Sequence, residues 1–172
     1  MNQSALKFGF ISGGIQSALM AVFSPIILSK ESSLASSQTI GYISMFVALA
    51  LIFWGIKERK AKGLGGEITF KQALETGALI AIISALIYTA AWMIISGLNP
   101  EFNDRIADMY RNDLSKTNLS PEELSKALTE IEISMKHYEN PLIKFAMTIL
   151  EILPIGLFGS LLASWILRTK KD

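Results

Sequence analysis

The residue most suited to chemistry is an acid in an otherwise uncharged apolar stretch, Glu151. An ionisable side chain inside a membrane-spanning segment is a functional candidate, because placing it in hydrocarbon is costly. Lys144 lies seven residues earlier on the same face of a helix and is a candidate ion-pair partner. Tyr42, Tyr88 and Trp92 complete a candidate intramembrane polar site. The alternative is that Glu151 is a hydrogen-bonded packing residue near the membrane interface.

A run of basic residues forms a second candidate set, Lys57, Arg59, Lys60 and Lys62. Basic side chains next to a span attract anionic lipid headgroups, by about 1 kcal/mol per charge near the surface. The glycines that follow do not match a phosphate-binding loop, which needs Gly-x-x-x-x-Gly-Lys-Ser/Thr after a strand. The sequence predicts lipid headgroup contact at these four residues. The alternative is a topological anchor followed by a turn.

Motifs for other chemistry are missing from the sequence. His137 is the only histidine, and there is no cysteine to form a disulfide, a thiolate or a metal ligand. No HExxH or GxSxG motif and no pair of catalytic carboxylates occurs. The 16 basic residues face 15 acidic ones, which argues against a nucleic-acid partner. We therefore predict no enzyme, no cofactor and no metal site.

Charged residues are almost absent from four long windows of the chain. Hydrophobic residues make up 51% of the sequence and charged residues 18%, below the value of about 25% that is typical of soluble proteins. A spanning helix needs about 20 mostly apolar residues, and a helix pairs every backbone polar group internally. We predict spans over 8–29, 40–56, 76–99 and 145–167.

Two other interpretations of these windows are weaker. A soluble bundle with buried helices would explain one window but not four. A signal peptide would explain the first, but its apolar stretch far exceeds the usual core of about 7–15 residues.

The distribution of basic residues predicts the orientation. Short loops rich in lysine and arginine stay in the cytoplasm, and the loop 57–75 and the C-terminal tail are both of this kind. We predict a multi-pass protein of the cell inner membrane with both termini in the cytoplasm. The insertion 100–141 then lies outside, where its mixed charges weigh less in the orientation rule than short flanks do.

The insertion 100–141 carries signals for two amphipathic helices. Asn99 and Pro100 are typical of an N-cap and a first helical residue, and Ser120 starts a second helix with Glu123 placed for a capping box. Asn140 and the proline after it stop this second helix. The two apolar stripes would pair as a helical hairpin, lie on the membrane surface or meet another protein.

Small residues recur every four positions in three of the predicted spans. Lipid tails are as apolar as leucine, so spans associate through close packing at small residues. We predict helix contact faces at Gly9, Gly13, Ser17 and Ala21, at Gly77, Ala81, Ala85 and Thr89, and at Gly156, Ser160 and Ser164.

Several segments resemble a known family. They read GYISM at 41–45, IFWGIK at 52–57 and GGEITF at 65–70, followed by Ala73, Gly77, Tyr88 and Trp92. This pattern resembles the bacterial family of small four-span membrane proteins called domain of unknown function 4199. The resemblance implies an inner-membrane protein without an assigned activity, and it supplies no catalytic residues.

These observations predict an all-α membrane protein with four transmembrane helices in a bundle and an extracytoplasmic helical hairpin between spans three and four. We expect a structural or interaction subunit, with the lipid bilayer, a second copy or another membrane protein as its partner. The alternative is a small transporter or channel subunit with a polar site near Glu151. An intramembrane enzyme is the weakest hypothesis, since no nucleophile-base pair or metal ligand set is present.

Overall fold

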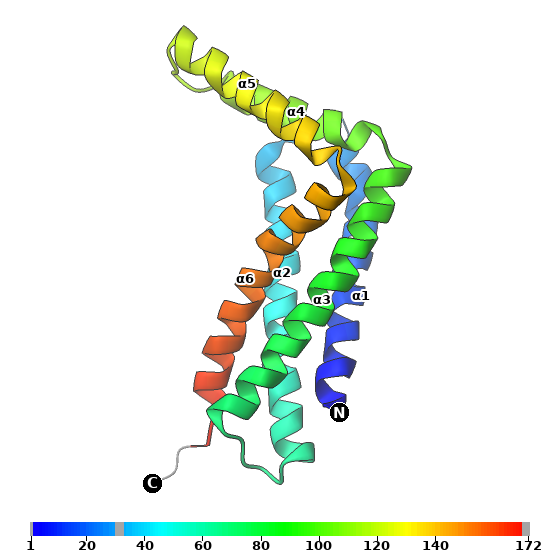
Figure 1. Ribbon diagram of the computed structural model, residues 1–172, viewed down its shortest axis with the longest axis vertical. Helices are drawn as coiled ribbons and strands as arrows, with labels where there is room; N and C mark the ends of the chain where they lie inside the picture. Colours follow the sequence, from blue (N-terminus) through cyan, green and yellow to red (C-terminus); the bar gives the residue numbers. More distant parts are fainter. Residues whose placement is uncertain (1, 30–32, 170–172) are drawn as a thin grey trace.

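The computed structural model describes residues 2–29 and 33–169, and it is helical almost throughout (Figure 1). The elements are α1 (Gln3–Leu28), α2 (Leu34–Glu58), the π-helical turn η1 (Arg59–Gly63), α3 (Phe70–Leu98), α4 (Glu101–Leu114), α5 (Pro121–Tyr138) and α6 (Pro141–Leu167). No strand occurs in these residues. The predicted all-α class is confirmed.

Four long helices lie side by side, and α4 and α5 cross one end of them at a steep angle (Figure 1). The four are α1, α2 with η1, α3 and α6, and each is long and apolar enough to cross a membrane. Each begins between one and two turns before the predicted window, because it starts at a polar cap that lies outside the apolar run.

The caps explain where these helices start. Ser33, Thr69 and Ser120 each form a capping box with the residue three positions later, as predicted for Ser120. At Ser120 the hydroxyl and the backbone N–H both donate to the Glu123 carboxylate, and these bonds lower the pKa of Glu123.

One predicted cap is wrong. Asn99 ends α3 instead of starting α4: its backbone N–H and its side-chain amide both donate to the Ile95 carbonyl. Pro100 is the N-cap of α4, and its side chain makes no capping bond. The chain turns within two residues here, so one asparagine cannot both close α3 and cap α4.

Close packing at small residues joins α3 to its neighbours. A Cβ added to Gly13 of α1 would lie 2.7 Å from the Ile87 Cβ, and one added to Gly77 of α3 would lie 2.8 Å from the Ser160 Cβ of α6. Gly156 of α6 approaches Ala81 just as closely, at 2.9 Å. The predicted contact faces are therefore confirmed at Gly13, Gly77, Ala81, Gly156 and Ser160, whereas Ala21, the last residue of the predicted face on α1, is exposed.

The α4–α5 pair is fixed to the bundle by a few contacts. α4 lies against α5, and its Phe102 is buried with its ring edge-on to Trp92 of α3, 4.9 Å between centroids. Arg105 donates from Nε to the Ser29 carbonyl at the end of α1, at 3.1 Å. α5 has no buried residue. The pair is thus held mainly through α4.

Changing Gly13 to Ala tests the packing between α1 and α3. We expect Gly13→Ala to lower the free energy of unfolding by about 1–3 kcal/mol, because the new methyl group would overlap Ile87. The measurement is thermal unfolding of the purified protein in detergent.

The matched control is Gly14→Ala, one position along the same helix, where an added Cβ meets nothing within 4 Å. Equal stabilities of the two variants would contradict the packing described here.

Candidate functional site

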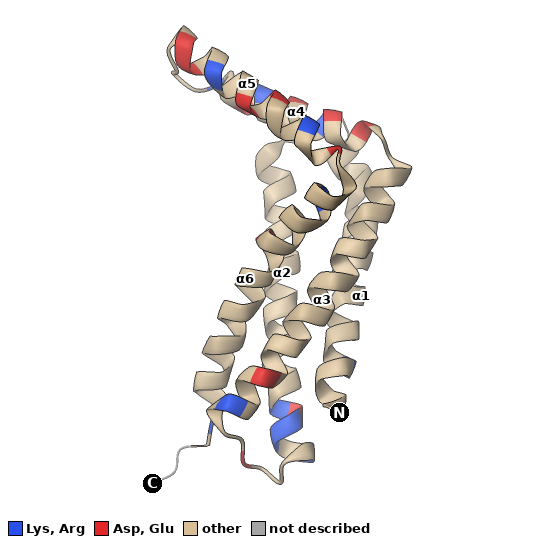
Figure 2. Ribbon diagram, viewed as in Figure 1, with Lys and Arg blue, Asp and Glu red and all other residues tan. Residues whose placement is uncertain are grey.

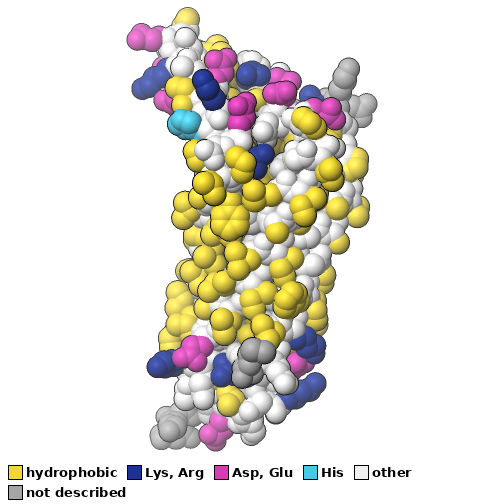
Figure 3. Space-filling view, turned by 45° about the vertical axis from the view of Figure 1, so that its right-hand side comes forward, with side chains coloured by type: hydrophobic (Ala, Val, Ile, Leu, Met, Phe, Trp, Pro, Cys, Tyr) yellow, Lys and Arg dark blue, Asp and Glu magenta, His cyan; other side chains and the backbone are white. Residues whose placement is uncertain are grey.

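Charged side chains gather at the two ends of the molecule, with few between them (Figure 2). The flank between these ends is covered with hydrophobic side chains on the face shown in Figure 3. Many hydrophobic side chains of the four long helices are more than half exposed, for example Phe46 at 72%, Leu150 at 71% and Phe158 at 62%. Charged groups inside this zone are therefore few, and a polar group buried there needs a hydrogen-bond partner.

A polar network lies at the end where α4 and α5 cross the bundle. The Trp92 indole N–H donates to the Tyr138 hydroxyl at 2.9 Å, and that hydroxyl lies 3.5 Å from the Thr148 hydroxyl. The Lys144 ammonium donates to the Ser96 hydroxyl at 3.3 Å and lies 5.3 Å from the centroid of the Tyr138 ring. Trp92 and Lys144 from the predicted site thus meet through Tyr138.

Tyr138 was not among the predicted site residues. Its sequence signal was its place at the end of the apolar stripe of α5, three residues before Pro141. The spacing of apolar residues places the Tyr138 ring on the apolar face of α5. Its contact with α3 depends on the angle between α5 and the bundle, which the spacing does not specify.

The other three residues of the predicted polar site lie apart from this network. Glu151 is exposed on α6, and within the described chain it makes no hydrogen bond and no ion pair, including with Lys144. Tyr88 is half-buried on α3, and its hydroxyl makes no hydrogen bond within the described chain. Tyr42 is 59% exposed on α2. In the described residues, no hydrogen bond joins it to the other four.

A buried polar cluster that the sequence analysis missed links α1 to α3. The Gln16 amide donates to the Ser84 hydroxyl at 2.6 Å and to the Ser12 hydroxyl at 3.2 Å, and Ser84 donates to Ser12 at 3.0 Å. Gln16 is only 2% exposed. A cavity of about 20 Å³ beside these residues has room for one water molecule. Gln16 carries no charge, so its side chain gives no sign of this role in the sequence.

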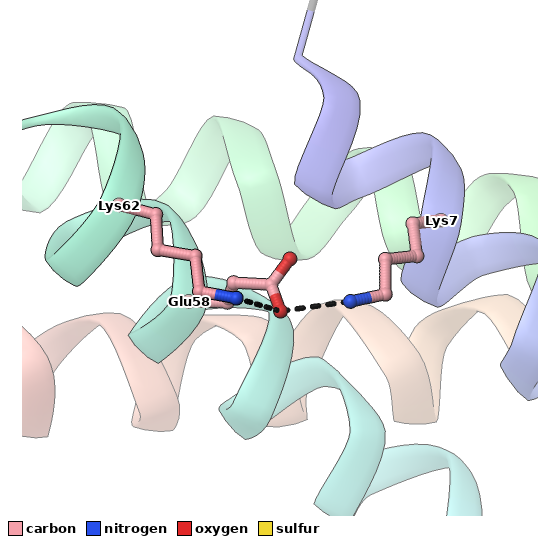
Figure 4. A network of polar contacts seen from close by, with 3 residues as sticks. All are labelled: Lys7, Glu58 and Lys62. Carbon is pink, nitrogen blue, oxygen red and sulfur yellow. Dashed lines mark hydrogen bonds and ion pairs between the residues drawn. The ribbon is translucent and has the colours of Figure 1, made fainter.

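An ion network lies at the basic end of the bundle, which is the end that carries Lys57, Arg59, Lys60 and Lys62 (Figure 4). One carboxylate oxygen of Glu58 lies 2.8 Å from the Lys7 ammonium and 3.7 Å from the Lys62 ammonium. Arg59 donates to the Gln72 carbonyl at 3.0 Å and to the Thr76 hydroxyl at 2.6 Å. The contacts therefore join α1, the end of α2 and the start of α3.

The other two basic residues of the predicted headgroup set have different environments. Lys60 donates to the Leu167 carbonyl at the end of α6, at 2.9 Å. Lys57 is exposed. The set predicted as one group is thus divided, and Lys7, from another helix, joins Arg59 and Lys62.

Replacing Ser84 tests the buried cluster. Ser84→Ala removes the acceptor on α3 for the Gln16 amide and the donor to Ser12, and we expect a loss of about 0.6–1.7 kcal/mol in the free energy of unfolding in detergent. Ser17→Ala is the control, because Ser17 donates only to the Gly13 carbonyl of its own helix. A larger loss in Ser17→Ala than in Ser84→Ala would refute the role of the cluster in joining α1 to α3.

Comparisons with known proteins give one match. A search of curated proteins and a search of solved structures found no match. A family model described as a protein of unknown function, DUF4199, matches residues 7–169 and so covers nearly the whole chain. The resemblance seen in the sequence is confirmed, and this chain belongs to the DUF4199 family.

Proposed function

We propose that this chain is an integral protein of a bacterial inner membrane, with α1, α2, α3 and α6 as its spans. The observation that carries the proposal is the exposed apolar flank between two charged ends (Figures 2 and 3). In water such a surface is unfavourable by roughly 25 cal/mol per Å² of apolar area, whereas in hydrocarbon this penalty disappears. The length and composition of the four helices support the same environment.

The basic end is proposed to face the cytoplasm. It holds Lys57, Arg59, Lys60 and Lys62, and the start of α1 and the end of α6 lie on this side of the bundle (Figure 1). The positive-inside rule then places the α4–α5 pair outside the cytoplasm. Four spans place the start of α1 and the end of α6 on the same side of the membrane, in agreement with this orientation.

The molecular role that we propose is that of an interaction subunit, not an enzyme. The α4–α5 pair extends sideways beyond the bundle (Figure 1), and no residue of α5 is buried. Ile133 on α5 is 52% exposed and Tyr110 on α4 is 40% exposed. Apolar side chains exposed on an overhanging helix pair are suited to contact a partner protein.

Photo-crosslinking tests the proposed contact. With a photoreactive amino acid in place of Ile133, we expect one defined adduct in intact membranes, formed with a partner or a second copy. The exposed position Lys126 on the same helix is the control. A clean monomer at every exposed position of α5, together with a monomer in detergent, would contradict the proposal.

The alternative role, a small transporter or channel subunit, is tested at Glu151. This residue makes no hydrogen bond or ion pair within the described chain, so Glu151→Gln leaves the fold intact. Solute flux in proteoliposomes that is lost in Glu151→Gln would favour transport over the interaction role.

A further inference from the structure

An open cavity of about 600 Å³ lies at the basic end of the bundle. Its walls come from the first turns of α1, residues 2–4 and Lys7, and from Glu58, Arg59 and Lys62 at the junction of α2 with η1. The volume is within the range of about 300–1,000 Å³ that is typical of small-molecule sites. Figure 4 shows that the two lysines approach Glu58 from different helices.

The lining of this cavity is strongly cationic. The lining holds three basic side chains, those of Lys7, Arg59 and Lys62, and one carboxylate, that of Glu58. The described lining therefore carries a formal charge of two positive units. Glu58 holds Lys7 and Lys62 by a shared carboxylate oxygen, at 2.8 and 3.7 Å. One acid therefore pairs with two cations and cannot neutralise both.

Arg59 is fixed as well, and part of its guanidinium remains available. Its Nη1 atom makes both bonds, to the Gln72 carbonyl and to the Thr76 hydroxyl. In the described residues, Nε and Nη2 have no acceptor. A guanidinium anchored on one side can present its other N–H groups to an oxyanion without losing further side-chain entropy.

The start of α1 adds to the positive potential. The N–H groups of Ala5 and Leu6 bond to the side chain and the carbonyl of Asn2. Those of Gln3 and Ser4, two cavity residues, have no acceptor in the described chain. The ligand suited to this lining is an anion rich in hydrogen-bond acceptors, and a phosphate group meets both conditions.

The cavity also lies beside the apolar flank. Trp54 is 63% exposed and precedes Glu58 by one helical turn, and Trp165 on α6 is 62% exposed, with Arg168 5.8 Å from its ring centroid. Exposed tryptophans near the ends of spans are typical of the headgroup zone of a bilayer. In the proposed membrane placement, the phosphate groups next to the cavity are those of phospholipids.

We propose that this cavity binds the phosphate group of an anionic phospholipid from the cytoplasmic leaflet, through Lys7, Arg59 and Lys62. This inference rests on the proposed membrane placement. The site is more specific than a general attraction of anionic lipid to the basic loop 57–75. It includes Arg59 and Lys62 from that loop and Lys7 from α1. Lys57 and Lys60 lie outside the cavity.

Lipid titration by native mass spectrometry tests the site. The full-length protein in detergent is titrated with phosphatidylglycerol, with phosphatidylcholine as the neutral-lipid comparison. We expect selective binding of phosphatidylglycerol that weakens about fivefold for each cavity lysine removed, and so more than tenfold in the double variant Lys7→Gln/Lys62→Gln. Arg59→Gln should weaken it similarly, while the melting temperature confirms that each variant is folded.

The control variant is Lys57→Gln, which removes the same charge from the same end of α2 but outside the cavity. We expect less than a twofold change. An equal loss in Lys57→Gln and in Lys62→Gln would mean diffuse attraction and overturn the site, as would equal binding of the two lipids. Competition by glycerol 1-phosphate at the affinity of the lipid would overturn the lipid source in favour of a soluble phosphate compound.

This experiment can fail separately from the membrane proposal. Carbonate extraction of cell membranes reports whether the chain is integral to the membrane, and it does not depend on Lys7 or Lys62. Retention in the membrane together with unselective lipid binding would reject the site alone.

Discussion

Close approach between helix backbones along α3 is the constraint on which the rest of the structure depends. Gly77 meets Ser160 of α6 on one side of α3, and Ile87 covers Gly13 of α1 on another. Where hydrocarbon surrounds the helices, water does not drive them together, so such contacts supply much of the attraction. Because α3 is held on both sides, its two ends define where the polar groups of the other helices meet.

Two polar regions follow from this arrangement. At one end, Thr76 and the Gln72 carbonyl of α3 hold Arg59, so that the turn after α2 faces the start of α1. At the other end, Trp92 and Ser96 of α3 hold Tyr138 and Lys144, which fixes the entry into α6. α3 therefore positions both the cationic cavity and the base of the α4–α5 pair.

Local features of this fold were predictable from the sequence, and long-range contacts were not. Runs of uncharged residues and capping boxes such as Ser120 with Glu123 depend on neighbours in the chain, so they predict the helices directly. The bond from Trp92 to Tyr138 joins residues 46 positions apart, and that from Lys7 to Glu58 joins residues 51 apart. Such pairs depend on the angles between helices, which periodicity does not specify. The role of Gln16 could not be predicted for a different reason. An uncharged amide becomes significant only when its hydroxyl partner on α3 is known.

The central claim is that the apolar flank faces lipid, with the basic end inside the cell. The chain has no cysteine, so single cysteines report without background. The direct measurement is labelling of Ser115→Cys, between α4 and α5, and of Ala61→Cys, in η1, with a membrane-impermeant thiol reagent. The account predicts that Ser115→Cys is labelled once the outer face of the inner membrane is exposed, and that Ala61→Cys is labelled only after this membrane is broken. Labelling of Ala61→Cys with the membrane intact, or recovery of the protein from the soluble fraction, would contradict it.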